Sequence, residues 1–147
     1  MLLPLLLALS AQSAPSLDVP GIILLGSGDT YYLSPTKSID RAGSVRRATL
    51  VEIYPAAVEG WEIIRRDSVL ELNCAEERFR ILAAQDFGDG DIKRGSPQPA
   101  PSGWAPLDRT DFPRAILFSM TCSDVNLNVI SYESLEDELP RLRRSRR

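Results

Sequence analysis

The side chains in this sequence that could carry acid–base or metal chemistry are carboxylates, because the chain contains no histidine. Histidine is the commonest general base near neutral pH and a common metal ligand, so histidine-dependent triads and zinc sites are excluded. The densest group of acids is Asp86, Asp89 and Asp91 in the segment DFGDGD, whose spacing loosely resembles a calcium-binding loop. The bidentate glutamate that such a loop needs is absent. A solvated hairpin turn is the favoured interpretation, and a hydrolase that uses Asp86 and Asp89 is kept as an alternative.

Other motifs do not complete a catalytic or binding site. The segment GSGD at 26–29 is similar to a phosphate-binding loop only superficially, since no Lys-Ser/Thr pair follows it, and we interpret it as a turn. Ser44, Ser68 and Ser119 have no base partner that the sequence identifies. We therefore expect no catalytic residue, no metal ligand, no cofactor and no enzymatic activity.

The aromatic residues offer a different kind of site. Trp61, Trp104, Tyr31, Tyr32 and Tyr54 could together form a recognition surface. Aromatic side chains in small β-rich domains more often fill the core, which is the favoured interpretation here.

The beginning of the chain has the pattern of a secretory signal peptide. An apolar block at 2–9 is followed by Ala11, Gln12 and Ser13, which resemble a small-residue cleavage site. The block is far shorter than the roughly 20 residues that a membrane span needs. We predict a signal peptide at 1–13, a domain at 14–124 and a C-terminal extension at 125–147, with the mature protein periplasmic or secreted and without a membrane span.

The chain has two cysteines, Cys74 and Cys122. In an oxidising compartment an isolated pair in one small domain favours a disulfide, while two buried free thiols are the alternative if the chain is not exported. A bond closing a loop of this length would contribute roughly 4 kcal/mol in the chain-entropy model.

Charge is distributed unevenly along the chain. The net charge is −3, and the last seven residues contain five arginines, so the remainder carries about −8. An acidic body argues against nucleic acid as a partner. The arginine-rich tail is expected to be a solvated end, and contact with anionic lipid or polysaccharide is the alternative.

Several segments show the pattern of β-strands. An apolar run at 22–25, a turn and an aromatic run at 30–33 predict a hairpin. A third strand is expected at 45–54, with its buried face undecided because Val51 and Ile53 alternate with Ala48 and Leu50. A strand at 66–74 should turn Ser68, Leu70, Leu72 and Cys74 inward, and it should pair antiparallel with a strand at 78–85 that turns Phe79, Ile81 and Ala83 inward.

A helix is predicted to follow these strands. Phe112, Ile116 and Met120 recur at helical spacing, Thr110 is the expected N-cap, and the helix should end near Cys122. A disulfide from a strand to the end of this helix would clamp the helix onto the sheet. The predicted fold class is α+β, an antiparallel β-sheet with a C-terminal helix packed on it and one disulfide.

The order of several short segments resembles a known family. These segments are TYYLSP at 30–35, SIDRAG at 38–43, LELNC at 70–74, RFRIL at 78–82, and WAPL at 104–107 before a helix ending in Cys122. Over residues 22–122 this looks like the surface-adhesin protein E-like family of small exported Gram-negative proteins. The resemblance implies the same sheet, helix and disulfide, and an adhesin that binds extracellular proteins.

Two functions are consistent with these features. The first is an exported, non-enzymatic binding module that engages a protein or surface polymer through a sheet face or aromatic patch. The second is a periplasmic structural or envelope-associated protein. The sequence alone does not separate them, and it makes no prediction of the oligomeric state.

Overall fold

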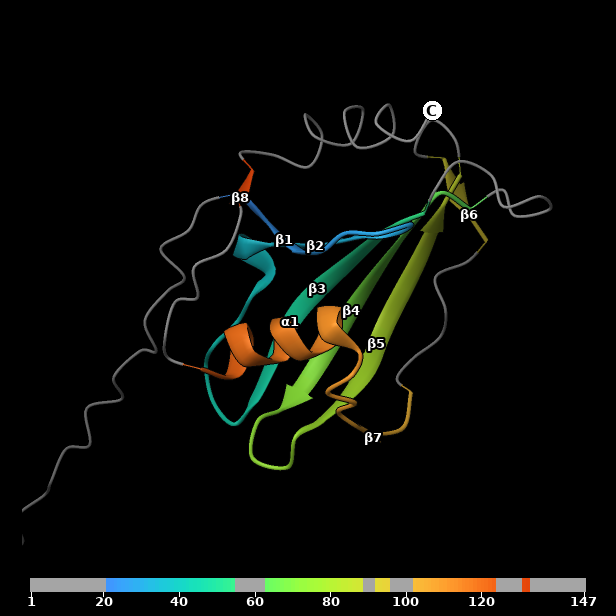
Figure 1. Ribbon diagram of the computed structural model, residues 1–147. Coiled ribbons are helices and arrows are strands. Elements are labelled where there is room, and N and C mark those ends of the chain that lie inside the picture. The colour runs from blue at the N-terminus through green and yellow to red at the C-terminus, as the bar shows by residue number, and fades with distance from the viewer. Residues whose placement is uncertain (1–20, 55–62, 89–91, 96–101, 124–130, 133–147) are drawn as a thin grey trace, which may run out of the picture.

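The computed structural model describes residues 21–54, 63–88, 92–95, 102–123 and 131–132. Over these residues the chain forms one antiparallel β-sheet with the helix α1 (Phe112–Cys122) lying across one of its faces (Figure 1). The predicted α+β class is thereby confirmed. The predictions for the signal peptide at 1–13, for Trp61, Asp89 and Asp91, and for the arginine-rich tail concern residues outside this description.

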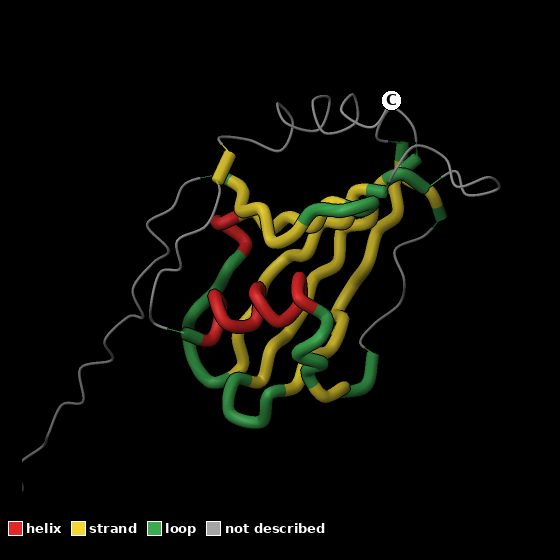
Figure 2. Tube along the Cα trace, viewed as in Figure 1, coloured by secondary structure: helices red, strands yellow, loops and turns green. Residues whose placement is uncertain are grey.

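Five consecutive strands form the body of the sheet as an antiparallel meander (Figure 2). They are β1 (Ile22–Gly26), β2 (Tyr31–Pro35), β3 (Val45–Ile53), β4 (Arg65–Asn73) and β5 (Arg78–Phe87). A short 3-10 helix, η1 (Thr36–Ser38), follows β2. Three two-residue strands complete the sheet: β6 (Lys93–Arg94) and β7 (Ala105–Pro106) on β5, and β8 (Ser131–Tyr132) on β1. Because β8 falls within the predicted extension 125–147, the sheet continues past the expected end of the domain.

The helix begins one residue later than the sequence pattern predicts. Asp111 is the N-cap residue, whereas Thr110 donates from its backbone and its hydroxyl to the Asp108 carboxylate and so belongs to the preceding turn. Phe112, expected on the apolar stripe, is 70% exposed. The first helical residue therefore lies outside the contact with the sheet, and the prediction of Thr110 as the N-cap is wrong.

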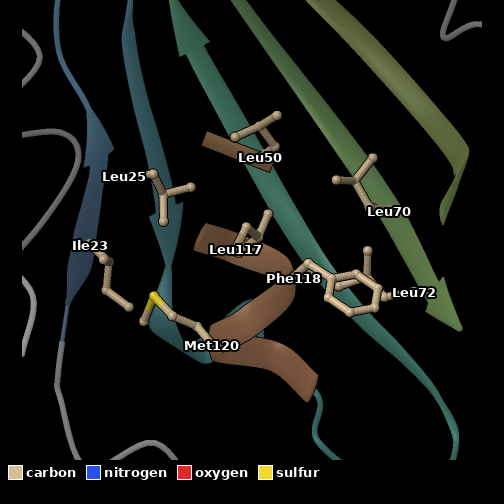
Figure 3. Close-up of a cluster of buried hydrophobic side chains, with 9 residues drawn as sticks. Ile23, Leu25, Leu50, Leu70, Leu72, Leu117, Phe118 and Met120 are labelled. Carbon is tan, nitrogen blue, oxygen red and sulfur yellow. The ribbon is translucent and has the colours of Figure 1, made fainter. Parts of the chain in front are cut away.

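The main core lies between α1 and the sheet. Leu117, Phe118 and Met120 of α1 are buried and point toward the aliphatic side chains of the strands (Figure 3). The buried strand residues are Ile23, Leu25, Ala48, Leu50, Leu70 and Leu72. Removing this much apolar surface from water is the main favourable contribution to folding.

The opposite side of the sheet holds a second buried cluster, formed by Ile22, Leu33, Val51 and Ile53. This cluster explains why the buried face of β3 was undecided from sequence. Ala48 and Leu50 face α1, while Val51 and Ile53 are equally buried on the other side. A strand buried on both faces has no alternating pattern from which one buried face can be chosen.

A register shift corrects one prediction for β5. Phe79 and Ile81 pack against the core beneath α1, as expected. Ile81 pairs with Leu70, whereas Ala83 pairs with the neighbouring residue Val69. One step along β4 therefore corresponds to two steps along β5, which has one extra residue at this point. A β-bulge reverses the alternation of side chains beyond it. The inward placement predicted for Ala83 is therefore wrong.

The C-terminal end of α1 is attached to β3 and to neighbouring loops by three side-chain contacts. Cys122 forms the expected disulfide with Cys74 in the turn after β4. Arg41 donates from Nε and Nη2 to the Met120 carbonyl at 3.0 and 2.8 Å, and Arg46 donates from Nη1 to the Thr121 carbonyl at 2.8 Å. The last carbonyls of a helix lack partners within it, so these cations both satisfy them and complement the helix dipole.

Candidate functional site

The face of the sheet turned away from α1 displays an array of charged side chains. We call this the helix-free face; it is formed by the outward side chains of β3, β4, β5 and β6. Successive residues of a strand point to opposite sides, so partners across the strands share a face. Because Leu70 and Leu72 face α1, Glu71 must face away from it, together with its cross-strand partners Arg47 and Arg80.

These three residues form a fixed ion-pair row. Glu71 Oε1 accepts hydrogen bonds from Nε and Nη2 of Arg47 at 3.2 and 2.9 Å. Glu71 Oε2 accepts from Nε of Arg80 at 2.7 Å, and Nη2 of Arg80 is 2.6 Å away. The Glu71 side chain is only 8% exposed, and the hydrogen bonds from Arg47 and then Arg80 hold its pKa below the ordinary range. The carboxylate thus orients two guanidinium groups, of which Arg47 is 60% exposed.

Aromatic rings support the arginines at two further points. The Arg80 guanidinium lies 4.7 Å from the centre of the Trp104 ring, and the Arg65 guanidinium lies 4.3 Å from that of Phe87. Such cation–π contacts restrict the side chains and contribute roughly 0.5–1 kcal/mol each when exposed. Arg65 also forms an ion pair with Asp67 at 2.6 Å.

The helix-free face is cationic although the whole chain is acidic. The register places five cations and two acids on it: Arg47, Arg65, Arg78, Arg80, Lys93, Asp67 and Glu71. The excess of positive charge contrasts with the net charge of −3 for the chain. An anionic partner would therefore be attracted to this cluster of cations.

A second polar cluster lies on the helix side of the sheet, close to the start of α1. Glu52, Arg66 and Asp86 are cross-strand partners on β3, β4 and β5, and Arg66 binds Asp86 through Nε and Nη2 at 2.6 and 2.9 Å. Burial raises the pKa of Glu52, an effect that Arg114 of α1 and Arg66 only partly offset. Burial, and then the negative charge of Glu52, raise the pKa of Tyr54 to about 12.

Replacing Glu52 with glutamine is expected to stabilise the protein at neutral pH. A carboxyl group whose pKa is raised by folding stabilises the fold fully below its ordinary pKa, here 4.5, and loses this contribution as pH rises through the raised value. Urea unfolding of wild type and Glu52→Gln at pH 4 and pH 7.5 should show a higher midpoint for the variant at pH 7.5 and a smaller difference at pH 4. Glu76→Gln is the control, since Glu76 is 61% exposed in the β4–β5 turn. A stabilisation of the same size at both pH values would contradict this account.

The remaining sequence-based candidates do not assemble into a single site. Asp86 is ion-paired with Arg66. Asp89, its proposed carboxylate partner, lies outside the described residues. Tyr31 packs with the cluster opposite α1, Tyr32 packs with the main core, and Trp104 contacts Arg80. The described aromatic residues are therefore distributed over both sides of the sheet, and they do not form the one recognition surface that was considered.

Ser44, Ser68 and Ser119 are likewise separated in the fold. Ser44 is exposed, Ser68 is buried in β4, and Ser119 is exposed on α1. Within the described residues there is no group of three or more Cys, Asp or Glu that could hold a metal ion. In the same part of the chain, no helix is long and apolar enough to cross a membrane.

Sequence reasoning missed the row formed by Arg47, Glu71 and Arg80. A partial signal was present, because the alternation of β4 places Glu71 opposite the buried leucines. The partners of Glu71 depend on how β3, β4 and β5 align. This register brings Arg47, 24 positions before Glu71, and Arg80, nine positions after it, to the same carboxylate. The side-chain pattern of one strand does not specify that register.

Over the residues that the structure describes, the fold and the site define a class: a small α+β domain with one sheet, one covering helix, one disulfide and a cationic helix-free face. Comparison of the chain with protein-family models, with curated proteins and with solved structures finds no match. The resemblance to the surface-adhesin protein E-like family accordingly remains a prediction from the sequence.

Proposed function

We propose that the mature chain is an exported, non-enzymatic binding module that engages a protein or a surface polymer through the helix-free face. The observation that carries this proposal is the row in which Glu71 holds Arg47 and Arg80 in fixed orientations. Pre-ordered side chains lose less conformational freedom on binding than mobile ones, so more of the interaction energy appears as affinity. Arg47 is well placed for contact because its side chain is 60% exposed.

The chemistry of the row suits recognition more than catalysis. Guanidinium groups stay protonated at physiological pH and offer paired donors to carboxylate, sulfate or phosphate groups. The polar cluster on the other side has its Asp86 carboxylate bound by Arg66 on both oxygens. An adhesin-like role is also what the family resemblance of residues 22–122 implies.

Export is part of the proposal and is supported by the Cys74–Cys122 disulfide, which is typical of oxidising compartments. Intact mass should be measured on protein from the periplasmic and medium fractions of a Gram-negative host, with and without reductant and alkylation. We expect a product that lacks roughly 13 residues and resists alkylation until it is reduced. A full-length chain with two free thiols in the cytoplasm would overturn this part of the proposal.

Binding is tested directly with fluorescently labelled mature protein. It is titrated onto intact Gram-negative cells and onto immobilised matrix proteins and polysaccharides, together with the charge-reversal variant Arg47→Glu. Lys37→Glu is the matched control, because Lys37 is an exposed cation in η1, outside the helix-free face. We expect saturable binding of wild type and the control to at least one surface, and its loss in Arg47→Glu. The absence of saturable binding to every surface would favour the periplasmic structural role.

A further inference from the structure

We infer that the partner of the helix-free face is a linear anionic polysaccharide that carries sulfate or carboxylate groups. This inference rests on the proposed function and specifies the class of ligand. It is argued from the charge of the face, from the donors that remain on its arginines and from its shape.

The charge of the face selects an anionic partner. Arg47, Arg78 and Lys93 are exposed, and they lie on β3, β5 and β6, so cations extend across the charged half of the sheet. The acids on this face, Asp67 and Glu71, are each bound by arginine. Glu71 is buried within the row, so the row presents no exposed carboxylate that would repel an anionic chain, and an exposed acid next to a cation of this face is Glu76, 3.8 Å from Arg78.

The arginines keep hydrogen-bond donors for a ligand. Arg47 and Arg80 contact Glu71 through Nε and Nη2, and among the described residues Nη1 of each makes no hydrogen bond. The two arginines are separated by the intervening strand β4, which places their strands about 10 Å apart. Two anionic groups along one extended chain can therefore be bound at once.

The shape of the face favours a polysaccharide over a nucleic-acid duplex. Many proteins that read a DNA duplex insert a helix or a pair of strands into a groove, whereas the cationic side chains here are spread over the surface of neighbouring strands. The half-buried Trp104 lies beside Arg80 and provides an apolar surface next to the charges, suited to the C–H faces of sugar rings. A sugar chain with regularly spaced acidic groups matches both features.

The test measures binding of heparin, a sulfated and carboxylated polysaccharide, to the full mature protein by isothermal titration calorimetry at low salt. Neutral dextran and a DNA duplex are the comparison ligands. We expect heparin to bind, neutral dextran not to bind, and Arg47→Gln to weaken heparin binding roughly fivefold, the value of one charge pair at contact distance in water. Lys37→Gln, which removes one exposed cation elsewhere, should leave the affinity unchanged.

A variant that is expected to bind heparin more tightly excludes loss of fold as the explanation for weaker binding in Arg47→Gln. Asp67→Asn removes a negative charge from the helix-free face and leaves the row formed by Arg47, Glu71 and Arg80 intact, so heparin affinity should rise roughly twofold while circular dichroism stays that of wild type. Unchanged or weaker affinity in folded Asp67→Asn would overturn the inference. So would full affinity in Arg47→Gln, which would place heparin elsewhere, for example on the C-terminal arginines.

The experiments distinguish a wrong ligand class from a wrong proposed function. DNA binding as tight as heparin binding, and equally weakened in Arg47→Gln, would replace the polysaccharide by nucleic acid. Saturable binding of the labelled protein to cells or matrix proteins without affinity for heparin would reject the polysaccharide and leave the binding function intact. If the protein bound neither heparin nor cells and matrix proteins, the proposed binding function would be rejected as well.

Discussion

Replacing Cys74 with serine is expected to lower the free energy of unfolding by roughly 4 kcal/mol, the largest effect of any single substitution considered for this chain. The disulfide joins residues 48 positions apart, so in the chain-entropy model it removes much of the freedom of the unfolded chain. It also connects the β4–β5 turn to the last residue of α1, whose buried side chains fill the core. The effect is measured by thermal and urea unfolding under non-reducing conditions.

Two controls separate the bond from the cysteine side chain. Cys122→Ser should lose the same stability as Cys74→Ser, because either change removes one bond, and the remaining cysteine should react with an alkylating reagent. Wild type with reductant should approach both variants. A Cys74→Ser melting temperature equal to that of oxidised wild type would show that the disulfide has no structural role.

Replacing Arg41 with alanine is expected to destabilise the fold by roughly 2–3 kcal/mol. Arg41 is 4% exposed, and two of its nitrogens donate to the Met120 carbonyl at the end of α1. The variant would lose charge-assisted hydrogen bonds and the packing of a buried side chain, and it would leave a helix carbonyl without its partner. Chemical denaturation of oxidised protein gives the value without interference from disulfide loss.

Arg46→Ala is the matched comparison for this prediction. Arg46 also binds a carbonyl at the end of α1, that of Thr121, but it is half-buried and its Nε contact is with an exposed loop carbonyl, that of Gly43. Water can replace contacts of this kind more readily, so we expect a loss of less than about 1 kcal/mol. Equal losses in the two variants would mean that burial of Arg41 has no special importance.

Local patterns explain which elements were predictable. The hairpin at β1 and β2, the strands β3, β4 and β5, and α1 all follow from apolar spacing and turn residues within short segments. The inward placement of Ser68, Leu70 and Leu72 is confirmed because β4 keeps strict alternation up to the turn at Cys74. The three two-residue strands β6, β7 and β8 were not predicted as such, since so few residues carry no periodic pattern.

The failed predictions arise where neighbouring elements override a local pattern. Ala83 changes sides because of a bulge that exists only when β5 pairs with β4. Phe112 satisfies helical spacing, yet it lies at the first position of α1, beyond the reach of the core. Arg41 lies in a loop, as the segment SIDRAG indicates, but its burial was not predicted, because it donates to a carbonyl 79 residues away.

The sequence by itself therefore determined the β-rich composition of the domain, its C-terminal helix and the pair of cysteines available for one bond, because these depend on residue type and short-range spacing. Tertiary structure alone decided that β3 is buried on both faces and that β5 changes sides at Ala83. It also decided which carbonyls Arg41 and Arg46 bind, and that Glu71 aligns Arg47 and Arg80 on the helix-free face. The physical reason is that these contacts join residues on different elements. Their geometry is set by strand register and helix docking, which arise from the packing of the whole core.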